Sequence, residues 1–172
     1  MLPPAESIQT PDGTPRDYYR EMVRGVVINT SGDLLILQKG PLSNTSWGWE
    51  FTGGSTIGII PAKPAKLVKE LMREMKEETK LKAGPNQIVP VEETFEYNRT
   101  HNGVLSLGLV HAFIVRLDHE QSRQKLTINQ RENLFDFRWI SPRRLEEMFY
   151  EVTGEGMRIS PNSRMIAEHV LA

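Results

Sequence analysis

The sequence predicts an α+β fold in which helices cover the faces of a mixed β-sheet. Short runs rich in valine and isoleucine come first, one long amphipathic helix follows, and further strands and short helices complete the chain, an order typical of helices layered on a sheet. The chain has 172 residues, of which 38% are hydrophobic, so it suffices for one core and is too apolar for intrinsic disorder. We therefore expect a single domain over residues 20–172, preceded by a flexible arm over residues 1–19.

The balance of charge and the missing cysteines exclude several classes of function. Lysine and arginine number 21 against 22 acidic residues, so the formal charge is −1 and no general basic field favours DNA or an anionic membrane. The absence of cysteine excludes disulfides, zinc–thiolate sites and a thiol nucleophile. No apolar run reaches the roughly 20 residues of a spanning helix, and no secretory-signal pattern is visible. We expect a cytoplasmic monomer or homodimer with no membrane partner and no DNA partner.

Two short strands and an aromatic segment make up the first part of the expected domain. Met22–Asn29 and Leu34–Gln38 flank a turn at Ser31-Gly32-Asp33, which predicts a β-hairpin. A loop over Gly40–Ser46 follows. The aromatic segment then contains Trp47, Trp49 and Phe51 and ends at Gly53-Gly54.

A long helix separates these strands from the rest of the chain. Apolar residues recur at helical spacing from Pro64 to Lys80, and proline suits a first helical turn because its missing N–H would have no partner there. The remaining expected elements are strands over Val91–Arg99 and Val104–Leu117 with a turn at residues 101–103, a polar surface loop over Asp118–Arg131, a strand over Phe135–Ile140, a helix over Arg143–Tyr150 capped by Ser141-Pro142, and a last helix from Ser160-Pro161 to Leu171.

Four glutamates share one face of the long helix. Glu70 and Glu78 each lie four residues from Glu74, and Glu77 lies three residues from it. Like charges at these spacings repel by about 0.2–0.5 kcal/mol per pair. A divalent cation between the carboxylates would remove that repulsion, and Mg²⁺ or Mn²⁺ favours such oxygen ligands. The alternative is a plain solvated face, supported by the opposite-charge pairs Lys66–Glu70 and Arg73–Glu77.

Two segments together resemble the Nudix hydrolase family. Its signature is Gly, five residues, Glu, seven residues, Arg-Glu, an aliphatic residue, any residue, Glu-Glu, any residue, Gly and an aliphatic residue. Trp49–Gly54 looks like the opening, and Arg73–Thr79 with Leu81 matches the second half. The resemblance covers roughly residues 20–150 and implies an α/β/α sandwich with a mixed sheet.

The chain departs from that signature in the loop before the helix. Arg73 follows Gly54 by 19 residues where the pattern expects 14, so the loop carries five extra residues, which we place within 57–63. The position of the first Glu holds Ile60 or Ala65, according to the end from which one counts, and no acid lies in Ser55–Ala65. Lys80 stands in place of the late Gly.

The resemblance implies a pyrophosphohydrolase that uses Mg²⁺ or Mn²⁺. It would act on a nucleoside diphosphate linked to another group, by attack of water on phosphorus. Glu74, Glu77 and Glu78 would be the metal ligands, with Glu74 and Glu78 the foremost direct ones. Arg73 would hold a carboxylate by a forked pair of hydrogen bonds, and Gly54 would let the metal or phosphate approach the main chain.

The general base and the substrate are less closely defined. Glu132 and Asp136 are the candidate bases, Glu92 and Glu93 are weaker ones, and all four are ordinary surface acids in the alternative interpretation. Trp49 and Tyr97 could stack on a nucleobase, although aromatic residues on strands are more often core. An RNA 5′ end is compatible with this reaction class.

Two hypotheses stay open. In the first, the intact Arg73-Glu74 and Glu77-Glu78 pairs belong to an active hydrolase. In the second, the missing loop acid marks a catalytically weak or inactive module of the same fold that binds a nucleotide or another protein. We favour the enzyme, because charge neutralisation by a metal is the larger catalytic contribution and three of the acids remain.

Overall fold

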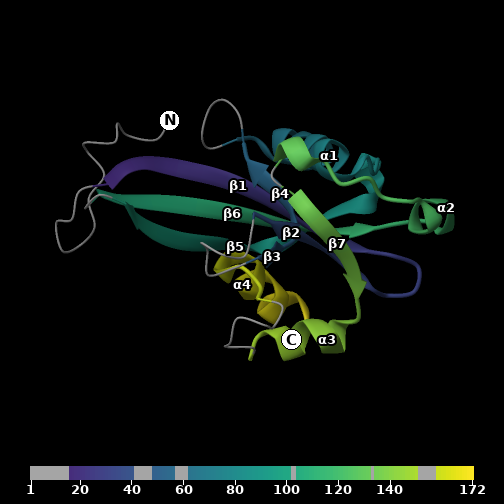
Figure 1. The fold of residues 1–172 in the computed structure, drawn as a ribbon. Coiled ribbons are helices and arrows are strands. Elements are labelled where there is room, and N and C mark those ends of the chain that lie inside the picture. The colour runs from purple at the N-terminus through teal and green to yellow at the C-terminus, as the bar shows by residue number, and fades with distance from the viewer. Residues whose placement is uncertain (1–15, 41–47, 57–61, 102–103, 133, 151–157) are drawn as a thin grey trace.

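The structure is a computed structural model that describes residues 16–40, 48–56, 62–101, 104–132, 134–150 and 158–172. Seven strands form one mixed sheet, and helices lie on both of its faces (Figure 1). The elements are β1 (Arg16–Ile28), β2 (Leu34–Lys39), β3 (Trp49–Glu50), β4 (Thr52–Ser55), α1 (Pro64–Thr79), the 3₁₀ turn η2 (Pro85–Gln87), β5 (Ile88–His101), β6 (Val104–Arg116), α2 (His119–Arg123), the 3₁₀ turn η3 (Gln130–Glu132), β7 (Leu134–Ile140), α3 (Pro142–Met148) and α4 (Pro161–Val170).

Strand β1 is the centre of the sheet. It runs parallel to β6 along most of its length, and β6 forms an antiparallel hairpin with β5. On its other side β1 pairs with β2 only at Ile28 and Leu34, because Met22–Gly25 pair with the short strand β4 instead. Strand β2 continues the sheet to β3 and β7. The expected hairpin is therefore confirmed, but it opens just beyond its turn to admit β4.

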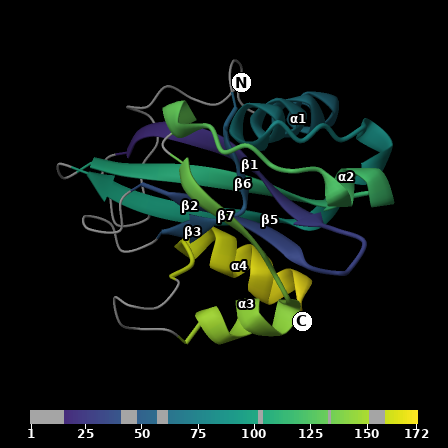
Figure 2. The ribbon, with the colours of Figure 1, turned by 45° about the vertical axis from the view of Figure 1, so that its right-hand side comes forward.

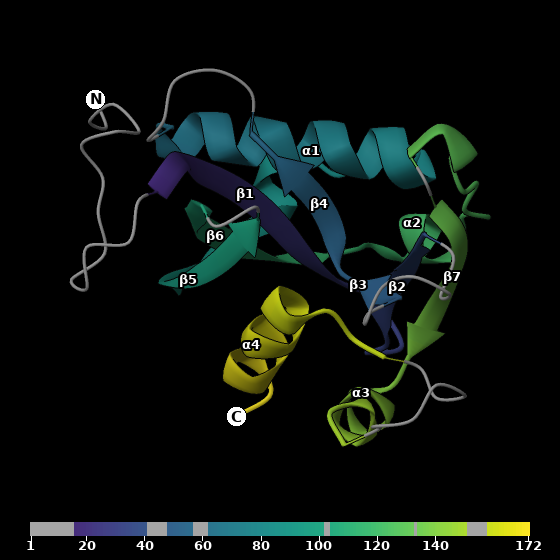
Figure 3. The ribbon, with the colours of Figure 1, turned by 60° about the vertical axis from the view of Figure 1, so that its left-hand side comes forward.

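The two faces of the sheet carry separate core clusters, as side-chain alternation along strands requires. Val23, Leu37 and Phe113 face α1, whose Leu71 and Met75 are fully buried against them. Alternate residues of the same strands, such as Val26, Ile36 and Ala112, face α3 and α4. Figures 2 and 3 show α1 along one face of the sheet and α3 with α4 against the other. The expected α/β/α sandwich is confirmed.

Helix α1 ends at Thr79, one residue before the predicted end, and Lys80 forms its C-terminal cap. Lys80 follows the last helical residue and has a φ of 65°, the left-handed region that glycine adopts most easily. Its N–H donates to the Lys76 carbonyl at 3.0 Å, which closes the final turn. Lys80 therefore adopts the backbone conformation that a glycine would take there without steric cost.

Two expectations on the boundaries were wrong. Residues 16–19 belong to β1, with Arg16 opposite Leu105, so any N-terminal arm is shorter than 1–19. The polar stretch 118–131 contains α2 and η3 rather than a continuous loop, because Asp118 accepts from the Gln121 N–H at 2.8 Å and caps a short helix. Residues 1–15, residues 41–47, which include most of the expected loop Gly40–Ser46, and residues 102–103 of the expected turn lie outside the described residues.

Among the described helices, none combines the length and the apolar character needed to cross a membrane.

Replacing Lys80 by glycine should stabilise the protein. The left-handed conformation costs a residue with a side chain roughly 1 kcal/mol, which glycine does not incur, so we expect Lys80→Gly to raise the free energy of unfolding by about 0.5–1 kcal/mol. Lys76→Gly, an exposed position inside the same helix, should lower it by about 1 kcal/mol. Urea unfolding of both variants checks this pair of opposite signs. A lower free energy of unfolding for Lys80→Gly would contradict the left-handed conformation of Lys80.

Candidate active site

The carboxylates of α1 lie against the glycine pair of β4. A Cβ added at Gly54 would lie 2.6 Å from Glu74 Oε1. Because glycine has no Cβ, the Glu74 carboxylate can lie beside the main chain. Gly53 has a φ of 145°, and a Cβ there would be 1.9 Å from the main-chain oxygen of Val23 on β1. Gly53 is thus required by its contact with the main chain of β1, whereas a side chain at Gly54 would displace the Glu74 carboxylate from its present position.

Glu78 is the most firmly held of these glutamates. Its Oε1 accepts hydrogen bonds from Thr52 Oγ1 at 2.7 Å and from the Gly53 N–H at 2.8 Å. The residue is only 2% exposed. Burial raises the pKa of the Glu78 carboxyl from 4.5 to about 7, although the two hydrogen bonds and the positive charges of Lys39 and Arg24 act in the opposite direction. At neutral pH this carboxyl is therefore poised between its two protonation states.

Arg73 gathers the other three glutamates. Its Nη2 donates to Glu70 Oε2 at 2.8 Å and to Glu74 Oε1 at 2.9 Å, and its Nη1 donates to Glu77 Oε2 at 2.7 Å. The expected pair Arg73–Glu77 is present, whereas Glu70 pairs with Arg73 and not with Lys66 as expected. The single guanidinium of Arg73 therefore forms ion pairs with three carboxylates.

Glu74 lies where the helix, the strand and a distant loop meet. Burial raises the pKa of its carboxyl, Arg73 opposes that rise, and the negative charges of Glu77 and Glu132 add to it. The turn that leads into η3 is hydrogen-bonded to the last turn of α1. Among the candidate bases, Glu132 is the one whose charge contributes to the raised pKa of Glu74.

Asn129 holds η3 in this position. Its Nδ2 donates to the Glu77 carbonyl at 3.0 Å and its N–H donates to the Glu78 carbonyl at 3.1 Å. Its own carbonyl accepts from the Glu132 N–H at 3.0 Å. A single side chain and its peptide groups therefore connect the last turn of α1 to the turn that carries Glu132.

The other candidate bases lie elsewhere. Phe137 and Trp139 of β7 pack on the core cluster beside α1, so Asp136 and Arg138 point to the opposite face by strand alternation. The Arg138 guanidinium indeed lies 5.5 Å from the ring centre of Trp49 on that face. Glu92 and Glu93 are exposed on β5, at the edge of the sheet.

The expected aromatic platforms do not gather at the carboxylates. Trp49 is 4% exposed and belongs to the core cluster beneath α3 and α4, so its ring has too little free surface to stack on a nucleobase. Tyr97 lies on β5 opposite Gly108, and its side chain is outside the described part of the structure. Trp49 is accordingly a core residue.

Glu21 organises both ends of the lengthened loop. Its carbonyl accepts from the Thr56 N–H at 2.9 Å, and its Oε1 accepts from the Ala62 N–H at 2.8 Å. The other oxygen, Oε2, lies 2.8 Å from Nε2 of His111 on β6. The five residues 57–61 of the expected loop 57–63 are outside the described residues.

The carboxylates fit a hard divalent cation in their chemistry. All the donors are oxygens, and Mg²⁺ commonly takes only one or two carboxylates and completes its octahedron with water and substrate phosphates. Gly54 leaves room for the Glu74 carboxylate beside the main chain. In their present conformations the described acidic and histidine side chains form no group of three that converges on one point. Glu74 and Glu78 both pack against the glycine pair of β4, Glu74 beside Gly54 and Glu78 on the Gly53 N–H.

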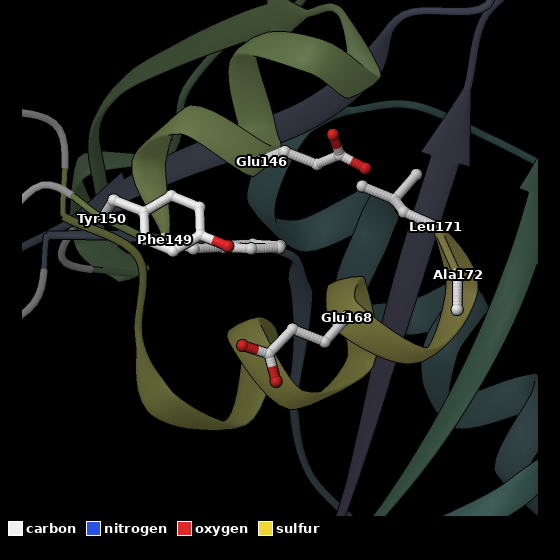
Figure 4. A pocket seen from close by; sticks show the side chains of 6 residues that line it. All are labelled: Glu146, Phe149, Tyr150, Glu168, Leu171 and Ala172. Atoms are coloured by element: carbon white, nitrogen blue, oxygen red, sulfur yellow. The ribbon is translucent and has the colours of Figure 1, made fainter.

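A separate concavity lies on the other side of the molecule. It has a volume of about 390 Å³ and opens between α3 and α4 (Figure 4). Phe149, Tyr150 and Leu171 line it together with Glu146 and Glu168. It contains none of the residues that the sequence predicts for the site, so the two features are distinct.

Comparison with known proteins gives a consistent result for the fold. No protein-family model matches the chain, and no curated protein matches it in sequence. Solved structures do match. The Nudix domain of NrtR from Shewanella oneidensis, determined with ADP ribose, has a TM-score of 0.59 at 15% identity and covers 95% of this chain and 92% of its own. The chain has a Nudix fold.

Two further Nudix-fold comparisons agree. The Nudix hydrolase RenU from M. smegmatis has a TM-score of 0.54 at 12% identity over 95% of this chain and 90% of its own. The MutT protein from Methanosarcina mazei Go1 has a TM-score of 0.53 at 18% identity over 89% and 92%. At these identities the likeness establishes the Nudix fold, while the activity has to be argued from the residues.

Several important residues escaped the sequence interpretation. Thr52 and Asn129 are linked to the glutamates only through tertiary contacts, for which the sequence spacing carries no signal. Glu70 was visible as a residue three positions before Arg73, but the competing pair with Lys66 concealed its role. Glu21, buried in β1, had no local pattern that could reveal it.

The raised pKa of Glu78 predicts a specific pH dependence of stability. A group whose pKa is higher in the folded state stabilises fully below its ordinary value of 4.5, and that contribution is lost as the pH rises through about 7. In chelator-containing buffer, Glu78→Gln should therefore gain stability over the natural protein between pH 5 and 8, by at most on the order of 3 kcal/mol. Glutamine keeps the acceptor oxygen for Thr52 and Gly53. Thermal unfolding curves that stay parallel across this pH range would contradict the prediction.

Proposed function

We propose that the protein is a metal-dependent hydrolase of a nucleoside diphosphate linked to another group, in which water attacks a phosphorus atom. The observation that carries the proposal is the packing of the acidic face of α1 against Gly53 and Gly54 within a Nudix fold. Four carboxylates and one guanidinium leave an excess of negative charge on a partly buried surface. Such a surface favours a cation, and a bound cation would in turn attract a diphosphate.

Glu74, Glu77 and Glu78 would hold Mg²⁺ or Mn²⁺. The ion would supply neutralisation of the diphosphate charge and a water of lowered pKa. Arg73 fixes the carboxylates of Glu74 and Glu77, which limits how far each can turn. Gly54 leaves room beside the main chain of β4 for the Glu74 carboxylate.

Glu132 is the general base in this proposal. Its charge acts on Glu74, and Asn129 attaches its turn to the end of α1. A carboxylate in that position can take the proton of the attacking water while the bond between phosphorus and the bridging oxygen breaks. The water oxygen then remains on the phosphate that it attacked.

A nucleotide substrate is supported by one structural neighbour. The NrtR Nudix domain was determined with ADP ribose, a nucleoside diphosphate linked to a second sugar. We include nucleotide sugars, dinucleoside polyphosphates and capped RNA 5′ ends in the same class, since each presents a phosphoric anhydride. Tyr97 is retained as the residue that would stack on the base.

A nucleotide-binding module without appreciable turnover is the second candidate. The observation that favours it is the stretch from Ser55 to Ala65, which carries no acid in a loop five residues longer than the family pattern. Binding would still use the glutamates and the glycine pair. It predicts ligand binding with no product formed.

Product analysis by mass spectrometry decides between the two. The purified protein is incubated with nucleoside triphosphates, ADP-ribose, nucleotide sugars, dinucleoside polyphosphates and capped RNA, each with Mg²⁺, Mn²⁺ or chelator. We expect metal-dependent cleavage of one class, with one atom of ¹⁸O from labelled water in a phosphate product. The double variant Glu77→Gln/Glu78→Gln should lose about a hundredfold or more of this activity, whereas Glu92→Gln should retain it. Binding without cleavage by folded protein would establish the second candidate.

The two candidate bases can be separated by matched amide substitutions. Glu132→Gln should lower kcat by about 10²–10⁴-fold, the usual contribution of a general base. Asp136→Asn, on the opposite face of β7, should leave kcat within about twofold, because a small effect is usual for a substitution away from the chemistry. Steady-state kinetics at saturating metal provides both values. An unaffected Glu132→Gln would remove Glu132 from the reaction.

A further inference from the structure

Glu70 holds one edge of the Arg73 guanidinium. Arg73 Nη2 lies 2.8 Å from Glu70 Oε2 and Arg73 Nε lies 3.3 Å from the same oxygen. The Glu70 side chain is 12% exposed and that of Arg73 is 32% exposed, so the pair is partly shielded from water. Glu70 therefore accepts hydrogen bonds from two nitrogens of the guanidinium, whereas Glu74 and Glu77 each accept from one.

The contact with Glu70 determines which hydrogen bonds Arg73 can make with the carboxylates of Glu74 and Glu77. A guanidinium presents its five N–H groups in a rigid plane, so fixing Nε and Nη2 also fixes the direction of Nη1. Arg73 then gives one hydrogen bond to Glu74 Oε1 and one to Glu77 Oε2. Released from Glu70, the same plane could turn and grip one carboxylate with two parallel hydrogen bonds, which is the preferred geometry of such a pair.

We infer that Glu70 is a positioning residue of the active site, which keeps Arg73 from closing on Glu74 and Glu77 and so leaves Glu74 Oε2 and Glu77 Oε1 to a metal ion. The inference rests on the proposed function. No acid lies between Ser55 and Ala65, and Glu70 is the nearest acid before Arg73 in the sequence. Glu70 acts through Arg73 and does not itself touch the substrate.

The test compares Glu70→Ala with Glu70→Gln. Alanine removes the partner of Arg73, whereas glutamine removes the negative charge but keeps an oxygen that can accept from Nε and Nη2. We expect Glu70→Ala to weaken Mn²⁺ binding, followed by electron paramagnetic resonance of the free ion, by about tenfold or more, as is typical when a residue that orients a ligand is lost. Glu70→Gln should retain most of the affinity, and kcat at saturating Mn²⁺ should fall less in Glu70→Gln than in Glu70→Ala.

Salt and a matched pair elsewhere control for simple charge effects. The Debye length falls to about 3 Å at 1 M salt, so a loss of affinity caused only by a missing charge should shrink there, and a loss caused by misplaced ligands should persist. Glu168→Gln removes one member of an ion pair of similar length, 2.7 Å from Arg164 on α4, and should not change Mn²⁺ binding. Circular dichroism verifies that each variant is folded.

The outcomes separate the inference from the proposed function. Equal losses in Glu70→Ala and Glu70→Gln that disappear at high salt would overturn the positioning role, as would two variants indistinguishable from the natural protein. In both cases Mn²⁺ binding and hydrolysis by the natural protein would leave the proposed function standing. A natural protein that neither binds Mn²⁺ nor cleaves any substrate of the panel would overturn the proposed function and, with it, the role of Glu70.

Discussion

The contact between the acidic face of α1 and the glycine pair of β4 is the constraint on which the site depends. Gly53 has a backbone conformation and a short distance to Val23 that exclude a side chain. Gly54 lies beside the Glu74 carboxylate, in the space that a Cβ would occupy. Thr52 and the Gly53 N–H then fix Glu78. Because β4 is paired with the central strand β1, the carboxylates lie in a fixed position relative to the centre of the sheet.

This arrangement concentrates negative charge where water is scarce. Folding brings Glu74 and Glu78 into contact with the sheet, and burial raises the pKa of both carboxyls, so the metal-free site carries an energetic cost that a cation would relieve. Arg73 relieves only part of it, being one positive charge among Glu70, Glu74 and Glu77. A fold stabilised by its two core clusters can sustain this cost at a site where the same charges are useful.

The sequence revealed the parts of the site that lie on a single element. The spacing of Glu74, Glu77 and Glu78 placed them on one helix face, and the structure has them on that face of α1. The sequence alone could not predict contacts between elements. The hydrogen bonds from Thr52 to Glu78 and from Asn129 to Glu77 depend on how β4 and η3 pack against the helix.

The errors in the fold have similar physical causes. Asp118 and Gln121 form a capping box that was present in the sequence and that predicts α2, but the polar composition around it favoured a loop. Trp49 was ambiguous because a buried aromatic residue and a stacking platform look alike in sequence, and only the burial beneath α3 and α4 separates them. The early start of β1 at Arg16 follows from pairing with β6, which no local pattern encodes.

Anomalous diffraction from crystals grown with Mn²⁺ tests the central claim most directly. We expect one or more manganese peaks within direct bonding distance, about 2.0–2.3 Å, of carboxylate oxygens of Glu74 and Glu78, beside Gly54 and away from the concavity between α3 and α4. Arg73 should remain bonded to Glu70 in that structure. Saturating Mn²⁺ with no peak at these carboxylates, or with peaks only elsewhere on the protein, would contradict the claim that α1 and β4 together form a metal site.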